Sequence, residues 1–482
     1  MRVISRNISL ESFRVKPLVL AGAQSAAARC QDYSAAQMTD TSIEKADAAQ
    51  AITSHGSTGP NGWAAEVPEL DALFLETIGT PEGRQDPYAR YRALREAAPV
   101  YRSGLGFVVC TRYEECQLVL RDPRLGKEEA SREERVQERF GHLEIFPKIE
   151  ELLSDRRSML FMNPPDHTRL RGLVSKAFTP RTVERLRPHI VELVDDLLDR
   201  IPTGEVVDVM EALAYRLPVA VISRMLGVPS SDWPRFREVV GRATVLLEPV
   251  IADEEIESAF EAQAELEAYF RDVVEERRKD PGDDLLSELI RVEEGSDRLT
   301  ELELISTAIL LFGAGFETTT NLIGNGLLAL LRHPEQLEGL RQELAGPATQ
   351  APAMRAAVEE LLRYDSPVQF DGRHVFAEID LSGVIVPAGG EIITALGAAN
   401  RDPEHFSEPE SLDLHRDEGP PMSFASGIHF CLGASLARAE GQVVFDRMLR
   451  RFSSIELATD APVFRNRITL RGLTELPVVF EN

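Results

Sequence analysis

The chain has 482 residues, of which 43% are hydrophobic and 27% are charged, a composition typical of a globular protein with a large buried core. Its formal net charge of -26 excludes general nucleic-acid binding, because the summed field repels a phosphate backbone. The spacing of Cys30, Cys110, Cys116 and Cys431 indicates neither disulfides nor a zinc site, which predicts a reducing, cytoplasmic environment.

Residues 1–62 are rich in Ala, Ser, Thr and Gln without a hydrophobic period, so we expect a poorly ordered N-terminal tail. The start of this tail is nearly free of acidic residues and resembles an organelle transit peptide. Alternatively, Met38 is an ordinary start and the upstream part is an over-extended reading frame, which is the interpretation we favour. No linker follows the tail, so residues 63–482 are predicted to form a single domain.

The remainder is mostly helical in pattern. Apolar residues recur every three or four positions over 87–99, 112–123, 180–201, 259–280 and 354–364. Strand signals are short: a hairpin near 100–111, two or three strands between 374 and 397, and a terminal hairpin over 466–480. The predicted fold class is therefore mainly α with small β-sheets.

A long helix is predicted from the capping pair Thr300 and Glu303 to the residue before Pro334. It is apolar enough to suggest a membrane span, but Glu317 and Asn321 interrupt it. We therefore expect a helix through the centre of a large domain and no membrane span.

The loop "FASGIHFCLG", residues 424–433, has the features of a thiolate ligand site. Cys431 precedes an amphipathic run, whose helical N-terminus would direct backbone N–H groups at the sulfur. Gly433 leaves room for a flat cofactor, and Gly427 permits a tight turn. Phe424 can cover the sulfur, and His429 can donate to the cofactor's acidic edge. The other cysteines are interpreted as small buried hydrophobic residues: Cys30, Cys110 and Cys116.

This loop resembles the haem-ligand loop of the cytochrome P450 family, with a departure at Ala425, where the family often has Gly. The resemblance covers about residue 66 to the C-terminus. It implies a cytochrome P450-like catalytic domain with haem b, an axial thiolate from Cys431, and O2 as co-substrate. The expected activity is that of a haem-thiolate monooxygenase.

Further motifs agree with the resemblance. Glu360 and Arg363 alone would be a solvated surface pair, but they resemble the family's Glu-x-x-Arg pair, for which His405 stands at the place of the completing residue. His167 and Arg171 lie four residues apart, and alone they would be an exposed basic helix start. The resemblance implies that four residues clamp the haem propionates: His167, Arg171, Arg373 and His429.

The long helix contains "AGFETT", residues 314–319. The Thr318 hydroxyl can bond back to the Ala314 carbonyl, which with Gly315 would open or bend the helix and leave a groove for oxygen. Glu317 is either a buried ion-pair partner or a proton carrier. The resemblance implies an acid and alcohol pair, in which Glu317 and Thr318 deliver protons during oxygen activation.

The resemblance to the soluble bacterial members of the family implies a separate ferredoxin and an NAD(P)H-dependent ferredoxin reductase as partners, and we expect a monomer. Basic residues are hypothesised to steer the ferredoxin: Lys176, Arg181, Arg438, Arg447, Arg450 and Arg451. An apolar pocket, which suits a terpenoid, steroid, fatty acid or polyketide, is predicted from Leu160, Phe161, Phe312, Phe316, Val368 and Phe370, although core packing gives the same composition. The alternatives are a peroxide-using or rearranging haem-thiolate enzyme and a non-catalytic haem sensor.

Overall fold

The computed structural model describes residues 68–127, 158–249, 251–293, 299–346 and 350–482, together with 141, 143, 146, 147 and 149. The predicted tail, 1–62, and the start of the predicted domain at 63 lie outside these residues. The described chain is rich in helices, with short strands between them, which confirms the predicted fold class.

The first half of the chain contains these helices and strands: α3 (Pro68–Gly79), α4 (Pro81–Gln85), α5 (Tyr88–Ala97), β1 (Val100–Arg102), β2 (Val108–Cys110), α6 (Tyr113–Arg121), β3 (Leu125–Gly126), α9 (Asp166–Val174), α10 (Pro180–Leu198), β4 (Val206–Asp208), α11 (Arg216–Leu226), α12 (Trp233–Ala243) and α13 (Asp253–Lys279). The second half contains α14 (Leu285–Glu293), α15 (Glu301–Arg332), α16 (Pro334–Ala345), α17 (Gln350–Tyr364), β5 (Phe370–Val375), β6 (Ile379–Leu381), β7 (Val384–Val386), β8 (Glu391–Ala395), α18 (Leu396–Ala399), α19 (Ala434–Arg451), β9 (Ser454–Leu457) and β10 (Pro477–Glu481).

The strands form three small sheets. The largest has the order β1-β2-β8-β5-β3, in which β2 and β8 are parallel and the other neighbours are antiparallel. The hairpin β1–β2 lies where the sequence predicted one. The terminal hairpin predicted over 466–480 does not form. Its second strand, β10, pairs with β9 and β4 instead, and the residues predicted as its first strand make only isolated bridges.

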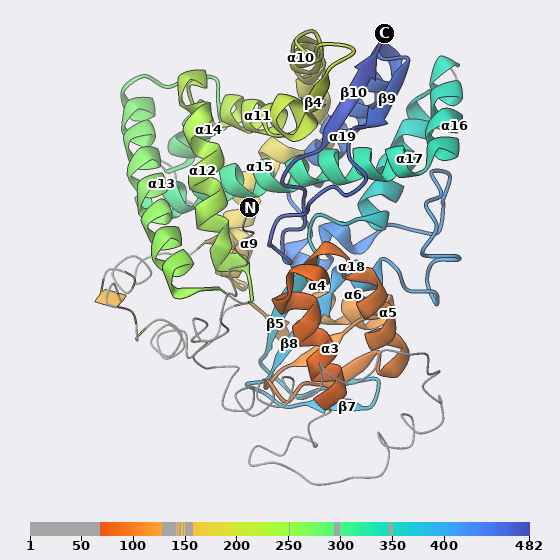
Figure 1. Ribbon diagram of the computed structural model, residues 1–482. Coiled ribbons are helices and arrows are strands. Elements are labelled where there is room, and N and C mark those ends of the chain that lie inside the picture. Colours follow the sequence, from red (N-terminus) through yellow and green to blue (C-terminus); the bar gives the residue numbers. More distant parts are fainter. Residues whose placement is uncertain are drawn as a thin grey trace, which may run out of the picture.

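Helix α15 runs across the middle of the molecule, and α3 to α6, α18 and the strands β5, β7 and β8 form a group below it in Figure 1. Its start is the predicted capping box: the Thr300 hydroxyl accepts from the Glu303 N–H at 3.2 Å, and the Glu303 carboxylate accepts from the Thr300 N–H at 2.8 Å. It is the one helix of the described chain long and apolar enough to cross a membrane. It packs against α11, α13, α17 and α19, which makes it the central core helix.

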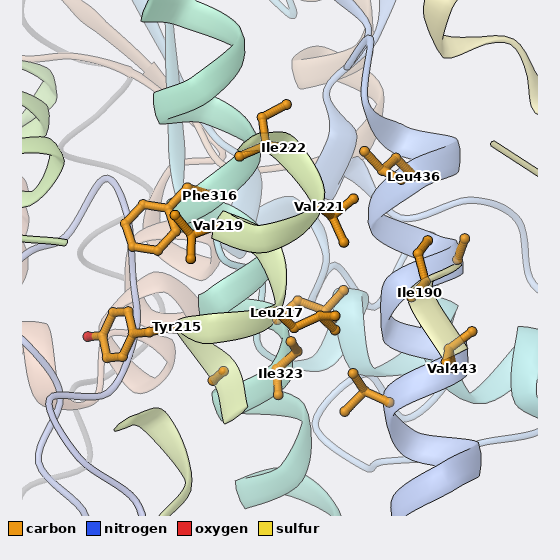
Figure 2. Close-up of a cluster of buried hydrophobic side chains, with 14 of the residues drawn as sticks. Ile190, Tyr215, Leu217, Val219, Val221, Ile222, Phe316, Ile323, Leu436 and Val443 are labelled. Atoms are coloured by element: carbon orange, nitrogen blue, oxygen red, sulfur yellow. The ribbon is translucent and has the colours of Figure 1, made fainter. Parts of the chain in front are cut away.

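Helix α11 packs against α15 and α10, and α10 packs against α19. Figure 2 shows apolar side chains of α11 between the ribbons of α15 and α19. Two glycines allow close contact with α15: a Cβ at Gly324 would lie 2.5 Å from the Met210 sulfur, and a Cβ at Gly326 would lie 2.7 Å from the Phe445 ring. Since interiors are packed to the density of organic crystals, this dense core holds α15 and α19 in fixed positions. The site described next lies on these two helices and the loop before α19.

Candidate active site

Cys431 lies in the loop that enters α19. Its backbone N–H donates to the Phe424 carbonyl at 3.0 Å. Burial raises the pKa of the Cys431 thiol, while hydrogen bonds from the Gly433 and Ala434 N–H groups and the charges of Arg171 and Arg438 act in the opposite direction. The donors predicted from the helix start are therefore directed at the sulfur. A metal cation bound to the sulfur would add the positive charge that a buried thiolate needs.

The conformation of this loop depends on two residues with positive φ. Gly427 has φ +71°, and a Cβ there would lie 2.1 Å from the Leu120 carbonyl oxygen of α6, so only glycine fits. Ala425 has φ +56° and ψ -155°, a conformation that favours glycine. Phe424 is buried, and the Arg438 guanidinium lies over its ring at 4.4 Å.

Two histidines and an arginine gather beside the loop. His167 of α9 and His429 lie with their ring centroids 4.2 Å apart. Burial, followed by repulsion from His167 and Arg373, lowers the pKa of His429 to about 3. Three nitrogen atoms of this group are buried without a hydrogen-bond partner among the described residues: Nε2 of each histidine and Nη2 of Arg373. Such a set of unsatisfied donors suits the carboxylates of a bound anionic group.

An additional basic residue belongs to this cluster. Lys127 follows β3, which pairs with β5, and its ammonium forms a half-buried ion pair with Asp371. Asp371 also accepts from Arg373 at 2.8 Å. Burial alone would raise the pKa of Asp371, but Lys127 and Arg373 outweigh it and lower this pKa to about 2. Sequence reasoning missed Lys127 because it is 244 residues from Asp371 and belongs to no local motif.

The AGFETT segment contains the predicted back-bond: the Thr318 hydroxyl donates to the Ala314 carbonyl at 2.7 Å. The helix nevertheless continues from Glu301 to Arg332, so it does not open at this segment, and the predicted bend and groove for oxygen stay predictions. A Cβ at Gly315 would lie 3.4 Å from the Ile222 side chain of α11, so Gly315 faces the core. Ala314 is exposed and Thr318 is half-buried, and these two residues lie on a different face.

The predicted pocket residues separate into two groups. Phe312 is 0% exposed and packs on Phe236 with ring centroids 4.5 Å apart, and Phe316 is buried against Tyr215. Figure 2 shows Phe316 in this apolar cluster. For Phe312 and Phe316 the pocket prediction is corrected, because they lie on the core face of α15. The accessible positions of α15 include four that recur four residues apart on another face: Ser306, Leu310, Ala314 and Thr318.

The other predicted pocket residues come from two segments, 160–161 and 368–370. Phe370 contacts Phe74 and Tyr91 edge-on, with ring centroids 6.0 and 5.9 Å apart, so it is part of a satellite core. Leu160 and Val368 are half-buried, and Phe161 is exposed. Of the six residues, Leu160, Phe161, Val368 and Phe370 thus keep some accessible surface, although the ring of Phe370 packs on the satellite core.

Glu317 has a partner that the sequence did not indicate. Its Oε1 lies 2.6 Å from Nη1 of Arg465, in the segment before β10. Arg465 also donates to the Asn321 side-chain carbonyl at 2.5 Å. Glu317 is therefore a buried ion-pair partner, and its role as a proton carrier stays a prediction. The arrangement leaves Glu317 Oε2 unpaired among the described residues.

The Glu360–Arg363 pair is buried, with contacts of 2.6 and 2.7 Å. Arg416 completes it, because its Nε lies 3.2 Å from Glu360 Oε2. The prediction that His405 completes it is corrected: the His405 ring stacks on Tyr113 at 3.5 Å instead.

The basic residues predicted to steer a redox partner are mostly neutralised. Ion pairs join Arg438 to Glu359, Arg447 to Asp195, Arg450 to Asp446, and Arg451 to Asp199. Lys176 and Arg181 are exposed. Next to Cys431, Ile428 and Phe430 are exposed apolar residues.

The fold, the Cys431 loop and the basic cluster together define a haem-thiolate protein, and comparison with known proteins agrees. Residues 118–469 match the model of the family described as Cytochrome P450. The chain is 40% identical over 421 residues to Cytochrome P450 107B1 of Saccharopolyspora erythraea, covering 86% of this chain and 98% of that protein. It is also 40% identical over 420 residues to the Vitamin D(3) 25-hydroxylase of Pseudonocardia autotrophica, covering 84% and 98%.

A solved structure, the myxobacterial cytochrome P450 CYP267B1 in complex with myristic acid, is similar with a TM-score of 0.76 and 38% identity, covering 85% of this chain and all of that one. The chain belongs to the cytochrome P450 family and is a monooxygenase. Enzymes of this family use haem b with a cysteine thiolate ligand, and O2. The unpaired donors of His167, His429 and Arg373 and the backbone donors at Cys431 fit this group.

Proposed function

We propose that this monooxygenase hydroxylates or epoxidises an apolar small molecule of the fatty-acid, steroid, terpenoid or polyketide kind. Accessible apolar surface on α15 supports the proposal: Ala314 is exposed and Leu310, one turn before it, is half-buried, on the helix that carries Thr318. The relatives support it as well, since one is named a vitamin D(3) hydroxylase and another was solved with myristic acid.

The residues that we propose to hold haem divide into two sets. Cys431 would supply the thiolate that binds the haem iron, with the Gly433 and Ala434 N–H groups stabilising its charge. His167, Arg171, Arg373 and His429 would donate to the propionates, and Lys127 with Asp371 keeps Arg373 in place. When bound, thiolate-ligated haem activates O2 and favours O–O cleavage.

Thr318 and Glu317 are proposed to deliver protons. The Thr318 hydroxyl donates to the Ala314 carbonyl, so its oxygen lone pairs stay available to accept from a proton donor. Glu317 is the adjacent residue and an ionisable group, and it is buried with its Oε1 against Arg465. Restricting protons to this pair limits the loss of reducing equivalents to peroxide.

Electrons are proposed to come from a ferredoxin and its NAD(P)H-dependent reductase in the cytoplasm, acting on a monomer. The exposed Ile428 and Phe430 beside Cys431 offer an apolar contact, and the exposed Lys176 and Arg181 offer positive charge. Charge reversal of Lys176 and Arg181 together is expected to reduce the salt dependence of haem reduction. Unchanged salt dependence would reject this docking surface.

The first experiment tests haem ligation. We expect the reduced, carbon monoxide-treated protein to show the far-shifted Soret band of thiolate-ligated haem, and Cys431→Ser to abolish it. Cys116→Ala, at a buried cysteine of α6, is the control and keeps the band. A wild-type protein without the band would contradict the assignment.

The second experiment separates the monooxygenase from a non-catalytic haem sensor and from a peroxide-using enzyme. Fatty acids, beginning with myristic acid, and steroids are screened for a blue shift of the Soret band. Each compound that shifts the band is incubated with a surrogate ferredoxin chain, and NAD(P)H consumption is compared with hydroxylated product. A band shift without product under NAD(P)H favours the sensor, and product only with added peroxide favours the peroxide-using enzyme.

A further inference from the structure

A small polar cluster joins α15 to the C-terminal segment. Glu317 and Asn321 are one turn apart on α15 and both are buried. Arg465 binds both, with Nη1 2.6 Å from Glu317 Oε1 and Nη2 2.5 Å from Asn321 Oδ1. The Arg465 side chain is 19% exposed and that of Glu317 is 4% exposed. The guanidinium therefore reaches from the solvent side to the buried carboxylate.

The segment 463–474 fixes the position of Arg465. The Arg465 N–H donates to the Gly472 carbonyl, and the Thr474 N–H donates to the Val463 carbonyl, each at 2.8 Å. A Cβ at Gly472 would lie 2.0 Å from Asn321 Oδ1 and 2.9 Å from Arg465 Nη2. Only glycine at position 472 permits this close approach, so the backbone here is shaped around the cluster.

The cluster has polar atoms that no described residue satisfies. Glu317 Oε2, Asn321 Nδ2 and Arg465 Nε are buried and without a hydrogen-bond partner among the described residues. They comprise one acceptor and two kinds of donor, which is the set that bound water can connect. Buried polar groups of this kind rarely stay unsatisfied, so a hydrated chain beside the carboxylate is the physically reasonable arrangement.

We propose that Arg465 is the positioning residue for proton entry, holding Glu317 and Asn321 so that water beside them connects solvent to the free oxygen of Glu317. This inference rests on the proposed role of Glu317 in proton delivery. A proton moves from solvent to the Glu317 carboxylate and from there toward Thr318, after which Glu317 is again a carboxylate. Arginine stays protonated in proteins, so Arg465 acts through its position and charge alone.

The charged and titratable groups around the cluster come from two further elements. Tyr215, just before α11, interacts electrostatically with Arg465 and Glu317, and Asp208 of β4 acts on Tyr215. Burial raises the pKa of Tyr215, so it stays neutral and cannot replace Arg465 as the counter-charge. A change at Arg465 is therefore expected to alter the pH profile through Glu317.

The test uses the holoenzyme with a surrogate ferredoxin chain. Arg465→Ala, Arg465→Gln, Arg465→Lys, Glu317→Gln and the double variant Arg465→Ala/Glu317→Gln are compared, with Arg467→Ala from the same segment as the matched control. Consumption of O2 and release of peroxide are measured against pH, in H2O and in D2O, with and without myristic acid. The reduced carbon monoxide spectrum verifies haem ligation in each variant.

We expect Arg465→Ala to lower the O2 turnover by about tenfold, less than the loss of a general acid itself, with a larger solvent isotope effect and a displaced pH profile. Arg465→Lys should recover part of the rate because it keeps the charge. The double variant should be no slower than Glu317→Gln, and Arg467→Ala should stay within about twofold of wild type.

If Arg465→Ala has the same O2 turnover and isotope effect as Arg467→Ala, while Glu317→Gln is slow, the role of Arg465 is rejected and the proton role of Glu317 stands. If Glu317→Gln is itself unimpaired, the proposed proton role of Glu317 fails, and this inference fails with it. If Arg465→Ala loses the thiolate spectrum, Arg465→Gln and Arg465→Lys take its place in the comparison of rates and isotope effects with wild type. Equal rates and equal isotope effects in Gln, Lys and wild type would then reject the role of Arg465.

Discussion

Arg416 donates to Glu360 at 3.2 Å and thereby joins the buried pair of Glu360 and Arg363. Arg363 also donates to the carbonyls of Asn400, Pro409 and Ser411, which ties α17 to the long segment before Cys431. The three charged side chains thus hold the segment that leads to the cysteine loop.

This relationship predicts different effects at positions 363, 416 and 405. Arg363→Ala should lower the free energy of unfolding by about 3 to 5 kcal/mol, because it leaves a buried carboxylate without its main partner. Arg416→Ala should cost less, about 2 kcal/mol, since Glu360 keeps Arg363. His405→Ala, which loses only the stacking contact with Tyr113, should cost about 1 kcal/mol. Urea unfolding measures all three, and a loss at His405 equal to that at Arg363 would contradict this order.

Replacing Ala425 by glycine is expected to stabilise the fold. Its φ of +56° with ψ -155° is strained for a residue with a Cβ. Ala425→Gly should therefore raise the free energy of unfolding by about 1 kcal/mol, after the entropic cost of glycine. Ala437→Gly, inside α19, is the control and should lower it by a similar amount. Urea unfolding of both variants checks the opposite signs, and destabilisation by Ala425→Gly would argue against strain at this position.

Glu440 of α19 predicts a pH dependence. Burial raises the pKa of Glu440 from 4.5 to about 8, and its Oε2 has no partner among the described residues. The folded state holds a proton that the unfolded state has lost, so stability is greatest below about pH 4.5 for this group and falls as pH rises toward 8. The fall is at most about 1.4 kcal/mol per pH unit.

Glu440→Gln removes this titration. The variant should gain stability relative to wild type as pH rises, and the gain at pH 8 should exceed the gain at pH 5. Unfolding by urea at several pH values measures the difference. Glu335→Gln, on the exposed start of α16, is the control, and its stability relative to wild type should be the same at pH 5 and at pH 8. A difference that does not vary with pH would show that Glu440 is not protonated in the folded protein.

Lys127 and Asp371 predict acid sensitivity. The pKa of Asp371, about 2 in the folded state against 3.8, means that this group stabilises the fold above pH 3.8 and loses that contribution as pH falls to about 2. Lys127→Met should lower the free energy of unfolding at neutral pH by about 3 kcal/mol and shift acid unfolding to higher pH. It should also speed haem transfer to apomyoglobin, because Arg373 loses its support.

Asp122→Asn provides the comparison for Lys127→Met. Asp122 pairs with the exposed Arg124, and such a surface pair contributes less than about 1 kcal/mol. The acid midpoint of Asp122→Asn should therefore remain close to that of wild type. Equal shifts in the two variants would mean that burial of the Lys127 pair adds nothing.

The features predictable from the sequence are local. The capping box of Thr300 and Glu303, the helix start before His167, and the hydrogen bond from Thr318 to Ala314 each depend on residues within four positions of one another. Helical geometry alone brings such residues together. The cysteine loop belongs to the same group, because its turn and the helix N-terminus after it are set by adjacent residues.

The tertiary structure decided the contacts between distant residues. Lys127 meets Asp371 through the pairing of β3 with β5, Arg465 meets Glu317 across 148 positions, and Arg416 takes the place predicted for His405. It also decided which face of α15 is core, and so removed Phe312 and Phe316 from the predicted pocket. The physical reason is the same in each case: ion pairs and burial depend on which elements pack together, and this depends on the whole core rather than on local spacing.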